Sequence, residues 1–384
     1  MEYVQERIAT LHDLGGSGST RTTAADRDLD GPVDETAVVV PMTGREHGSP
    51  AAERVLSELE TLDPPPAAVF VPVRAPPDRI GPFREWIESF ALPSRILWCN
   101  APDVENLLGD AGLATGFGKG RDVWLAVGPA ADAAEYVVVH DADARSYEAA
   151  HVRRLLAPLS MDAGFEFSKG YYARVEQGQL YGRLFRLFYR PLIRALAADH
   201  DEPILDYLGA FRYALAGEFA MTGALARRLR TPRAWGLEVG TLGDAFQYAG
   251  FAGSAQVDLG RHVHDHRAVA GEAGLEGMSR EVAAALLRVL EEGGVEPAYE
   301  TLPDRYRAAG ERLLEQYRAD ASFNGLEYDR ASERAQLERY AESIAPPGPD
   351  RRLPRWIDAP FGPADVLEAA RPWREHRVDP SAGD

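Results

Sequence analysis

The most informative segment of the chain is Tyr136-Val137-Val138-Val139-His140-Asp141-Ala142-Asp143-Ala144-Arg145-Ser146-Tyr147. Three consecutive valines beside an aromatic residue predict a strand that is buried in a parallel sheet. Two carboxylates, Asp141 and Asp143, follow directly. Ligands of open α/β sheets bind at the carboxyl ends of the strands, so this pair could join a divalent cation to a diphosphate. The alternative is a plain turn, because aspartates are common turn formers.

Strands and helices alternate on both sides of this segment. Apolar strands are expected at residues 36–41, 67–73 and 95–99, with amphipathic helices between them. This order predicts an α/β fold with a mostly parallel central sheet and helices on both faces. No Gly-x-Gly-x-x-Gly follows the first strand, which disfavours a dinucleotide-binding dehydrogenase. Later in the chain, 165–175 is expected to be an antiparallel or mixed-sheet strand, and 279–345 to be helical.

Composition and charge exclude several classes of protein. Hydrophobic residues make up 45% of the 384 residues, and no apolar run approaches the ~18–20 residues that span a bilayer. The single cysteine, Cys99, excludes an intrachain disulfide framework, and the start of the chain lacks a secretory pattern, so we expect a cytoplasmic protein. The net charge of −18 argues against a nucleic-acid-binding surface.

The basic residues are almost all arginines. Only two of the 42 are lysines, Lys119 and Lys169, while 60 residues are acidic. Excess acid with little lysine predicts a halophilic protein that stays hydrated at high salt. Lys119 lies between two glycines where a helix is expected to begin, which favours binding of a phosphate. The spacing is not that of a Walker A loop, and the alternative is a surface lysine in a turn.

Histidines and glutamates supply further candidates. His262, His264 and His266 would share one face of a strand, where one of them could complete a Mg²⁺ or Mn²⁺ site with the aspartates. The alternative is a polar edge strand with solvated histidines. Glu218 and Glu238 lie in apolar, glycine-containing segments and could bind a substrate hydroxyl, act as raised-pKa acids, or cap helices. A metal, a diphosphate loop and acceptor groups together indicate transfer of a sugar from a nucleotide diphosphate.

The order of these motifs resembles the retaining GT-A glycosyltransferases of the glucosyl-3-phosphoglycerate synthase and mannosyl-3-phosphoglycerate synthase type. The matching segments lie between about residues 36 and 290. They are Gly118-Lys119-Gly120, Asp141-Ala142-Asp143, Lys169-Gly170-Tyr171-Tyr172, Gly182-Arg183, Leu215-Ala216-Gly217-Glu218-Phe219-Ala220, Gly236-Leu237-Glu238-Val239-Gly240 with Asp244, and Ala255-Gln256-Val257-Asp258-Leu259-Gly260 before His264.

The resemblance implies a role for each matching residue. Metal ligation by Asp143 and His264 is expected, and the catalytic residues are expected to be Glu238 together with Leu215 and Ala216, whose backbone would lie near the reacting sugar carbon. In such enzymes the departing diphosphate itself accepts the acceptor's proton. The donor contacts are expected to be Pro41, Met42, Thr43, Glu46, Asn100, Gly118, Lys119 and Asp141, and the acceptor contacts Gly182, Arg183, Leu184, Glu238, His262 and His266.

Departures from the family pattern bear mainly on the acceptor. Phe185 replaces a phosphate-binding threonine, and His262 and His266 replace an arginine and an asparagine. The loop after the first strand, 41–46, and the end of the third strand, 98–101, also differ, which affects the contacts to the nucleotide. The donor chemistry therefore transfers better than the identity of the acceptor.

These expectations give a metal-dependent retaining hexosyltransferase, with UDP-glucose as donor and 3-phosphoglycerate as acceptor in compatible-solute synthesis. The alternatives are another acceptor (glycerate, a sugar or a lipid phosphate) or a non-catalytic nucleotide-sugar-binding scaffold. We expect an N-terminal helix and linker (1–35), a GT-A domain (36–278, with donor half 36–147 and acceptor half 148–278), a helical extension (279–345) and a Pro/Arg-rich tail (346–384). The extension could pair two subunits into a homodimer.

Overall fold

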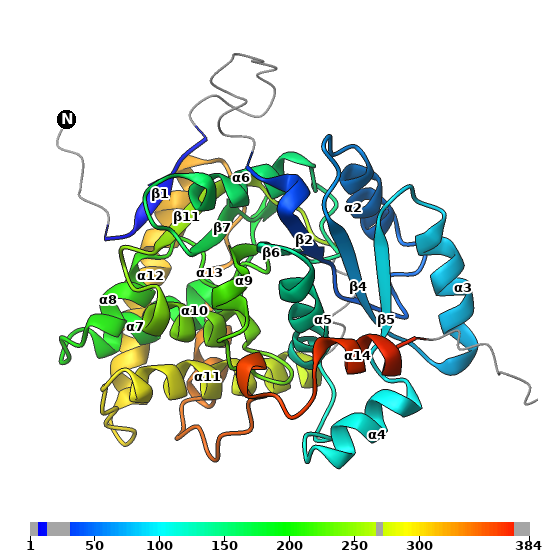
Figure 1. Cartoon of the computed structure of the whole chain (residues 1–384). Helices are drawn as coiled ribbons and strands as arrows, with labels where there is room; N and C mark the ends of the chain where they lie inside the picture. Colours follow the sequence, from blue (N-terminus) through cyan, green and yellow to red (C-terminus); the bar gives the residue numbers. More distant parts are fainter. Residues whose placement is uncertain (1–6, 14–30, 266–271, 372–384) are drawn as a thin grey trace, which may run out of the picture.

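The computed structural model describes residues 7–13, 31–265 and 272–371. A nine-stranded sheet runs through the middle of the molecule, in the order β1-β11-β7-β10-β6-β2-β4-β3, with β5 paired to β4 (Figure 1). The strands are β1 (Ala9–Leu11), β2 (Thr36–Val39), β3 (Met42–Thr43), β4 (Ala68–Arg74), β5 (Ser94–Trp98), β6 (Tyr136–Val139), β7 (Phe167–Ala173), β10 (Phe219–Thr222) and β11 (Ser254–Arg261). A separate hairpin joins β8 (Val175–Glu176) to β9 (Gln179–Leu180).

The sheet is mostly parallel, as the alternation of elements predicts. Among its described strands only β10 runs antiparallel, to both β6 and β7. The predicted strand 136–139 lies at the centre, where Val137, Val138 and Val139 are wholly buried. It pairs in parallel with β2, Val39 opposite Val139, so both strands end at the same edge of the sheet. Loops that follow parallel strands therefore meet at that edge.

Helices surround the sheet. The α5 helix contacts β2, β4 and β6, whereas α6 contacts β6, β7, β10 and β11. None of the described helices has both the length and the apolar character needed to cross a membrane. Their bounds are η1 Val33–Glu35, α2 Pro50–Glu60, α3 Pro77–Glu88, α4 Pro102–Asp110, α5 Lys119–Ala133, α6 Ala150–Ser160, the π-helix η2 Leu184–Tyr189, α7 Arg190–Leu196, α8 Pro203–Ala210, α9 Gly223–Ala226, α10 Leu237–Tyr248, α11 Glu272–Glu292, α12 Leu302–Phe323, α13 Arg330–Ala341, η4 Trp356–Asp358 and α14 Pro363–Ala369.

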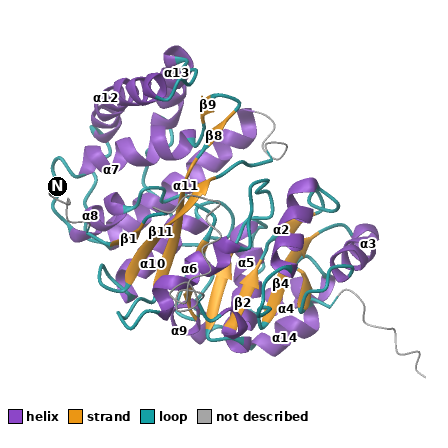
Figure 2. Cartoon of the chain, turned by 90° about the horizontal axis from the view of Figure 1, so that it is seen from above, coloured by secondary structure: helices purple, strands orange, loops and turns teal. Residues whose placement is uncertain are grey.

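The C-terminal helices pack against the rest of the chain. The α12 helix lies on α7 and α13, and α11 lies on α10 (Figure 2). The Tyr306 hydroxyl of α12 donates a hydrogen bond to the Leu187 carbonyl of η2, and the Tyr317 hydroxyl donates to the Arg186 carbonyl at 3.2 Å. These long helices thus have partners within the chain, which removes the reason for expecting them to pair two subunits.

The described part of the tail covers the outer side of α5. The ring of Trp356 stacks on Trp124, with 4.5 Å between the ring centroids, and its Nε1 donates to the Trp124 carbonyl at 2.8 Å. Gly128 permits this contact, because a Cβ there would lie 2.1 Å from the indole. The α5 helix is consequently buried between sheet and tail, which explains why its sequence is apolar on nearly all sides.

The predicted N-terminal helix is wrong for the part that the structure describes. Residues Ala9–Leu11 form β1, which pairs in parallel with β11, Ala9 opposite Ala255. The spacing of Ile8 and Leu11 suits a helix, but the open edge of β11 supplies backbone partners that a short isolated helix lacks. Residues 1–6 and the linker at 14–30 lie outside the described residues.

Candidate active site

The Asp-Ala-Asp segment lies where β6 and β2 end side by side. Backbone pairing brings the histidine segment to it: the Arg145 amide donates to the Val263 carbonyl at 2.8 Å, and the Asp265 amide donates to the Asp143 carbonyl at 2.8 Å. This pairing places His264 Nδ1 3.2 Å from Asp143 Oδ1. Two residues 121 positions apart thus form one pair, the pair that the family resemblance implies for a metal site.

Asp143 and His264 are the groups that could hold a divalent cation. Burial raises the pKa of Asp143, but the hydrogen bond and charge of His264 outweigh it and bring the pKa to about 2, so the carboxylate stays ionised. The Nε2 atom of His264 is buried and has no hydrogen-bond partner among the described residues. No described group of three or more His, Cys, Asp or Glu side chains could hold a metal by itself. A hard cation here therefore needs further oxygen ligands, which a diphosphate or water can supply.

Lys119 lies between two carboxylates. Its Nζ is 2.6 Å from Asp141 Oδ1 and 2.8 Å from Glu238 Oε1. Burial would lower the pKa of this lysine, but the two carboxylates raise it above its ordinary value. Burial would likewise raise the pKa of Glu238, but Lys119 and Lys169 outweigh it and hold the pKa below its ordinary value. Lys119 and Glu238 are therefore both charged at neutral pH.

A cavity of 380 Å³ opens beside these groups. Most of the predicted donor residues line it, together with several that the sequence did not indicate. Asn100 does not, because its amide accepts from the Ala75 nitrogen and donates to the Ala75 carbonyl, both at 3.0 Å. The lining residues are Pro41, Met42, Thr43, Arg45, Glu46, Arg74, Phe117, Gly118, Lys119, Asp122, Asp141, Ala142, Asp143, Ala234, Trp235 and Glu281.

The residues that sequence reasoning missed come mainly from strand ends and from a distant loop. Arg74 ends β4, the neighbour of β2, and its Nε lies 3.3 Å from Asp122 Oδ2. Its place at a strand end was a usable signal, but arginine is too abundant in this chain to stand out. Trp235 and Glu281 come from the second half of the chain, and only tertiary packing brings them to the cavity.

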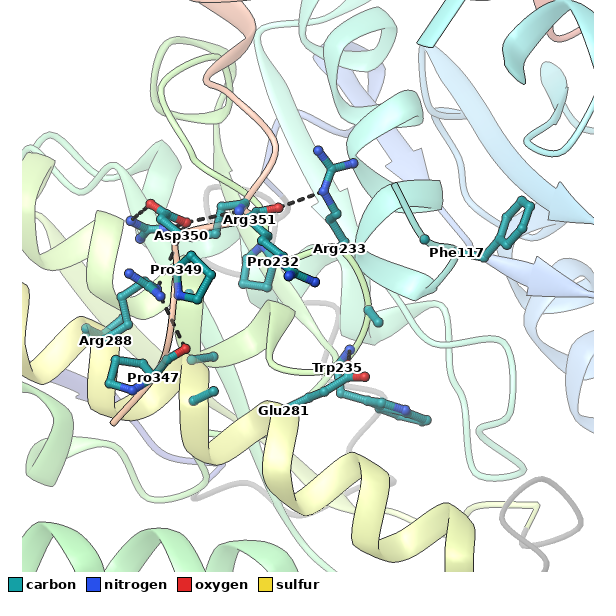
Figure 3. A pocket seen from close by; sticks show the side chains of 17 residues that line it. Phe117, Pro232, Arg233, Trp235, Glu281, Arg288, Pro347, Pro349, Asp350 and Arg351 are labelled. Atoms are coloured by element: carbon teal, nitrogen blue, oxygen red, sulfur yellow. Dashed lines mark hydrogen bonds and ion pairs between the residues drawn. The ribbon is translucent and has the colours of Figure 1, made fainter. Parts of the chain in front are cut away.

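A second cavity of 380 Å³ adjoins the first and shows what holds the glycine-rich loop (Figure 3). The Arg233 Nε donates to the Arg351 carbonyl at 2.6 Å, and the Trp235 amide donates to Glu281 Oε2 at 2.9 Å. The segment 232–235 in turn touches the loop, because a Cβ on Gly120 would lie 1.8 Å from the Pro232 carbonyl oxygen. The tail and α11 thus hold segment 232–235 in place, and the start of α5 packs against that segment.

Lys169 and Glu218 are buried beneath the site. Lys169 Nζ donates to the Ala216 carbonyl at 2.5 Å, and burial lowers the pKa of this lysine to about 8. Glu218 is wholly buried, and burial together with the charge of Asp141 raises its pKa to about 7. Residue type alone did not separate the two glutamates, but the structure gives Glu218 the raised pKa and Glu238 the lowered one.

The glycine-rich turn before Glu218 closes on the aspartate pair. A Cβ added to Gly217 would lie 2.2 Å from Asp141 Oδ2, so only glycine allows the backbone to approach this carboxylate. The neighbouring Ala216 is buried, and its amide donates to the Tyr213 carbonyl at 3.1 Å. Leu215 is half-buried. The backbone of 215–217 therefore lies against the group that Lys119 holds.

The predicted acceptor loop is held from two sides. Gly182 has φ +74°, and a Cβ there would lie 3.0 Å from the Tyr213 hydroxyl. Arg183 Nε donates to Glu333 Oε1 at 3.1 Å, so α13 holds this side chain. Leu184 is half-buried, and Phe185 is buried with its ring 4.9 Å from that of Tyr213. Phe185 thus belongs to an aromatic core below the loop.

The position of His262 argues against its predicted role as an acceptor contact. It is wholly buried, and its ring stacks on Tyr172 with 4.1 Å between centroids. A ring without accessible surface leaves no face for an acceptor to touch. The solvated edge-strand alternative is also wrong, because β11 lies between β1 and β7 and ends at Arg261. His266 lies outside the described residues.

Comparison with known proteins decides the family. Over 391 residues the chain is 32% identical to the glucosyl-3-phosphoglycerate synthase of Methanococcoides burtonii, covering 96% of this chain and 96% of that enzyme. The chain belongs to the glucosyl-3-phosphoglycerate synthase family. The synthase of Persephonella marina is 35% identical over 321 residues, which cover 80% of this chain and 79% of that one. Family membership makes the chain a glycosyltransferase, as the order of its motifs predicts.

Solved structures of the synthase family share the fold. The Mycobacterium tuberculosis synthase, in complex with Mn²⁺, uridine diphosphate and phosphoglyceric acid, matches with a TM-score of 0.54 and 24% identity over 76% of this chain and 88% of that chain. At this identity the match concerns the fold, which it confirms as α/β with a mostly parallel sheet. No family model matches the chain.

Proposed function

We propose that this chain transfers glucose from UDP-glucose to 3-phosphoglycerate, with retention of configuration and with Mg²⁺ or Mn²⁺ as cofactor. The observation that carries the proposal is the cluster in which Lys119 bridges Asp141 and Glu238 at the cavity that Asp143 also lines. Two relatives named for this reaction support it, at 32% and 35% identity over most of the chain. The mycobacterial synthase binds Mn²⁺, uridine diphosphate and phosphoglyceric acid.

We assign the 380 Å³ cavity to the donor. The Lys119 ammonium lies at the start of α5, where the helix dipole and backbone amides also favour a diphosphate. The donor half at 36–147 then contributes most of the lining, and the half at 148–278 contributes the acceptor groups. The donor contacts are Pro41, Met42, Thr43, Glu46, Gly118, Lys119 and Asp141.

We assign the cation to Asp143 and His264. A carboxylate and an imidazole suit Mg²⁺ and Mn²⁺, and the two side chains are already paired. When bound, the cation supplies positive charge that neutralises the departing diphosphate. Lys119 contributes a second, permanent charge to the same group.

On the acceptor side, Glu238 accepts a hydrogen bond from a hydroxyl rather than acting as an acid, because its pKa is lowered and it is ionised. The loop of Gly182, Arg183 and Leu184 binds the charged end of the acceptor. Arg183 is suited to this because Glu333 occupies its Nε, while the structure gives its two terminal nitrogens no partner among the described residues. The backbone of Leu215 and Ala216 lies next to the reacting sugar.

Gly217→Ala is expected to weaken donor binding at least tenfold while the protein stays folded. The new methyl group would lie 2.2 Å from Asp141 Oδ2, so the carboxylate must move away from Lys119. Calorimetric titration with UDP in the presence of Mn²⁺ measures the change. Gly209→Ala is the control, because its Cβ would meet only the Ile193 Cγ2 at 3.7 Å. Equal UDP affinity in the two variants would contradict the contact.

A donor-by-acceptor screen tests the proposed function. UDP-, GDP- and ADP-glucose and GDP-mannose are crossed with 3-phosphoglycerate, glycerate and no acceptor, in molar KCl with Mg²⁺ or Mn²⁺. We expect nucleotide release and a product of the mass of glucosyl-3-phosphoglycerate from UDP-glucose and 3-phosphoglycerate. Nucleotide release with glycerate but not with 3-phosphoglycerate would identify glycerate as the acceptor instead. Binding of UDP without release from any donor would establish the scaffold alternative instead.

We also infer that the protein works in a cytoplasm of high salt concentration, where its product serves as a compatible solute. The net charge of −18 and the presence of only two lysines support this. Turnover and thermal stability are expected to rise from about 0.1 M to molar KCl, since salt screens the repulsion between acidic groups. Activity that falls over this range would contradict the inference. Solution mass at the same salt concentration tests the homodimer that the long helices suggested from the sequence; because these helices have partners within the chain, we expect the mass of one chain.

A further inference from the structure

We propose that Arg174 binds the charged end of the acceptor, beside the metal ligand His264. The proposal rests on the proposed function and adds a binding residue to it. Arg174 lies between β7 and β8, two residues after Tyr172, so both side chains leave the same face of the extended chain. Tyr172 packs against His262 and lies with its ring centroid 6.3 Å from that of His264.

Contacts on either side place the Arg174 guanidinium between the metal ligand and the acceptor loop. Its NH1 donates to the Tyr213 hydroxyl at 3.3 Å, and the same hydroxyl lies 3.0 Å from the position of a Cβ on Gly182. Its NH2 faces Glu176 Oε1 at 3.9 Å, and that oxygen accepts from the His264 amide at 3.3 Å. One hydroxyl therefore links Arg174 to the acceptor loop, and one carboxylate links it to the metal-binding segment.

The charge of Arg174 is incompletely paired within the described chain. Glu176, its ion-pair partner, lies at the outer limit for such a contact, and Tyr213 is a neutral group. The Nε atom is buried and has no hydrogen-bond partner among the described residues. A largely buried guanidinium is normally paired with a carboxylate or a phosphate. With 19% of the side chain exposed, an anionic ligand can still reach it.

An arginine at this place suits the acceptor's chemistry. A planar guanidinium binds a carboxylate or a phosphate through two parallel hydrogen bonds, which fixes the orientation of the ligand as well as its position. Phe185 offers the acceptor no polar group. Arg174 would therefore add a second cationic contact to the one that Arg183 provides. Glu176 would then keep Arg174 in place until the acceptor arrives.

The test compares Arg174→Gln and Arg174→Lys with the unchanged enzyme. We expect the glutamine variant to raise the KM for 3-phosphoglycerate roughly 10- to 100-fold, because a hydrogen bond to a charged group is lost. The lysine variant keeps the positive charge but loses the planar guanidinium with its paired donors. Its KM for 3-phosphoglycerate should therefore lie between those of the unchanged enzyme and the glutamine variant. The Kd for UDP with Mn²⁺ should be unchanged in both, which also shows that both are folded. Arg212→Gln is the control, since its guanidinium lies over Tyr171 on the other face of β7.

Comparing 3-phosphoglycerate with glycerate shows whether Arg174 binds the phosphate or the carboxylate of the acceptor. If Arg174 holds the phosphate, the glutamine variant loses kcat/KM for 3-phosphoglycerate but not for glycerate; if it holds the carboxylate, both fall together. An unchanged KM for both acceptors, with normal UDP binding, would overturn the proposal and leave the proposed function standing. Calorimetric titration of the UDP-loaded protein with 3-phosphoglycerate gives a readout without turnover. No binding to the unchanged protein would refute both proposals at once.

Discussion

Asp143→Ala is expected to lower kcat/KM about 1000-fold and to remove the dependence of turnover on divalent metal. The Asp143 carboxylate pairs with His264 at 3.2 Å and stays ionised at neutral pH, so it is the anionic half of the proposed metal site. Neutralising the charge on a departing diphosphate is worth several kcal/mol, which corresponds to about three powers of ten in rate. His264→Ala should have a smaller effect, because a histidine binds a metal as the neutral imidazole, whereas Asp143 supplies a negative charge.

Two readouts are needed for this prediction. Mn²⁺ binding measured by electron paramagnetic resonance with UDP present should weaken in Asp143→Ala, and turnover should no longer follow the Mn²⁺ concentration. Asp110→Ala is the control, because it removes one exposed carboxylate at the end of α4. Turnover within twofold of the unchanged enzyme, with the same response to Mn²⁺, would show that the cation is held elsewhere.

Lys119→Met is expected to reduce kcat/KM by a similar factor, mainly through loss of donor binding. The methionine keeps the length of the side chain but removes the cation that lies between Asp141 and Glu238. Two carboxylates then face the diphosphate without compensation, so repulsion replaces attraction. The Kd for UDP should rise at least tenfold. Arg79→Met, on the exposed surface of α3, is the control for loss of one positive charge.

The same variant should change the pH dependence of any remaining activity. In the unchanged enzyme, Lys119 and Lys169 hold the pKa of Glu238 below its ordinary value, so its carboxylate remains ionised as the pH falls. Without Lys119, the effect of burial is less opposed and that pKa rises. The acid limb of the rate profile should therefore move to higher pH. An acid limb at unchanged or lower pH would argue against Glu238 as the ionised acceptor contact.

Local patterns in the sequence identified the central strand and the start of α5, and most of the predicted donor residues line one cavity. Three valines before Asp141 identify a buried strand because burial on both faces demands a continuous apolar run. Lys119 stood out because lysine is rare here, and its neighbouring glycines mark the start of a helix. The assignment of Asp143 and His264 as a metal pair came from the family resemblance, and the structure places the two side chains 3.2 Å apart. The strand and the helix start depend on short-range rules, which a sequence displays directly, whereas the pair of Asp143 and His264 depends on contacts between residues 121 positions apart.

Contacts between segments that are distant in the sequence could not be predicted from short-range rules. The Ile8–Leu11 spacing suggested a helix, yet β1 forms because β11 leaves an edge open. The sequence placed His262 with His264 on one face, and their ring centroids do lie 4.3 Å apart, but it could not show that the first ring is buried against Tyr172. Only the contact between the tail and α5 explains why Gly128 has no side chain.

What the sequence determined by itself was an α/β sheet with Asp141 and Asp143 at the carboxyl end of its central strand, because strand burial and turn residues can be recognised from consecutive residues. What only the tertiary structure decided was the state of each charged group. Glu218 and Glu238 look alike in sequence, but one is buried near Asp141 and the other touches Lys119, so their pKa values move in opposite directions. Arg174 is one arginine among many in the sequence, and it became a candidate for acceptor binding only through its contacts with Tyr213 and Glu176 in the folded chain.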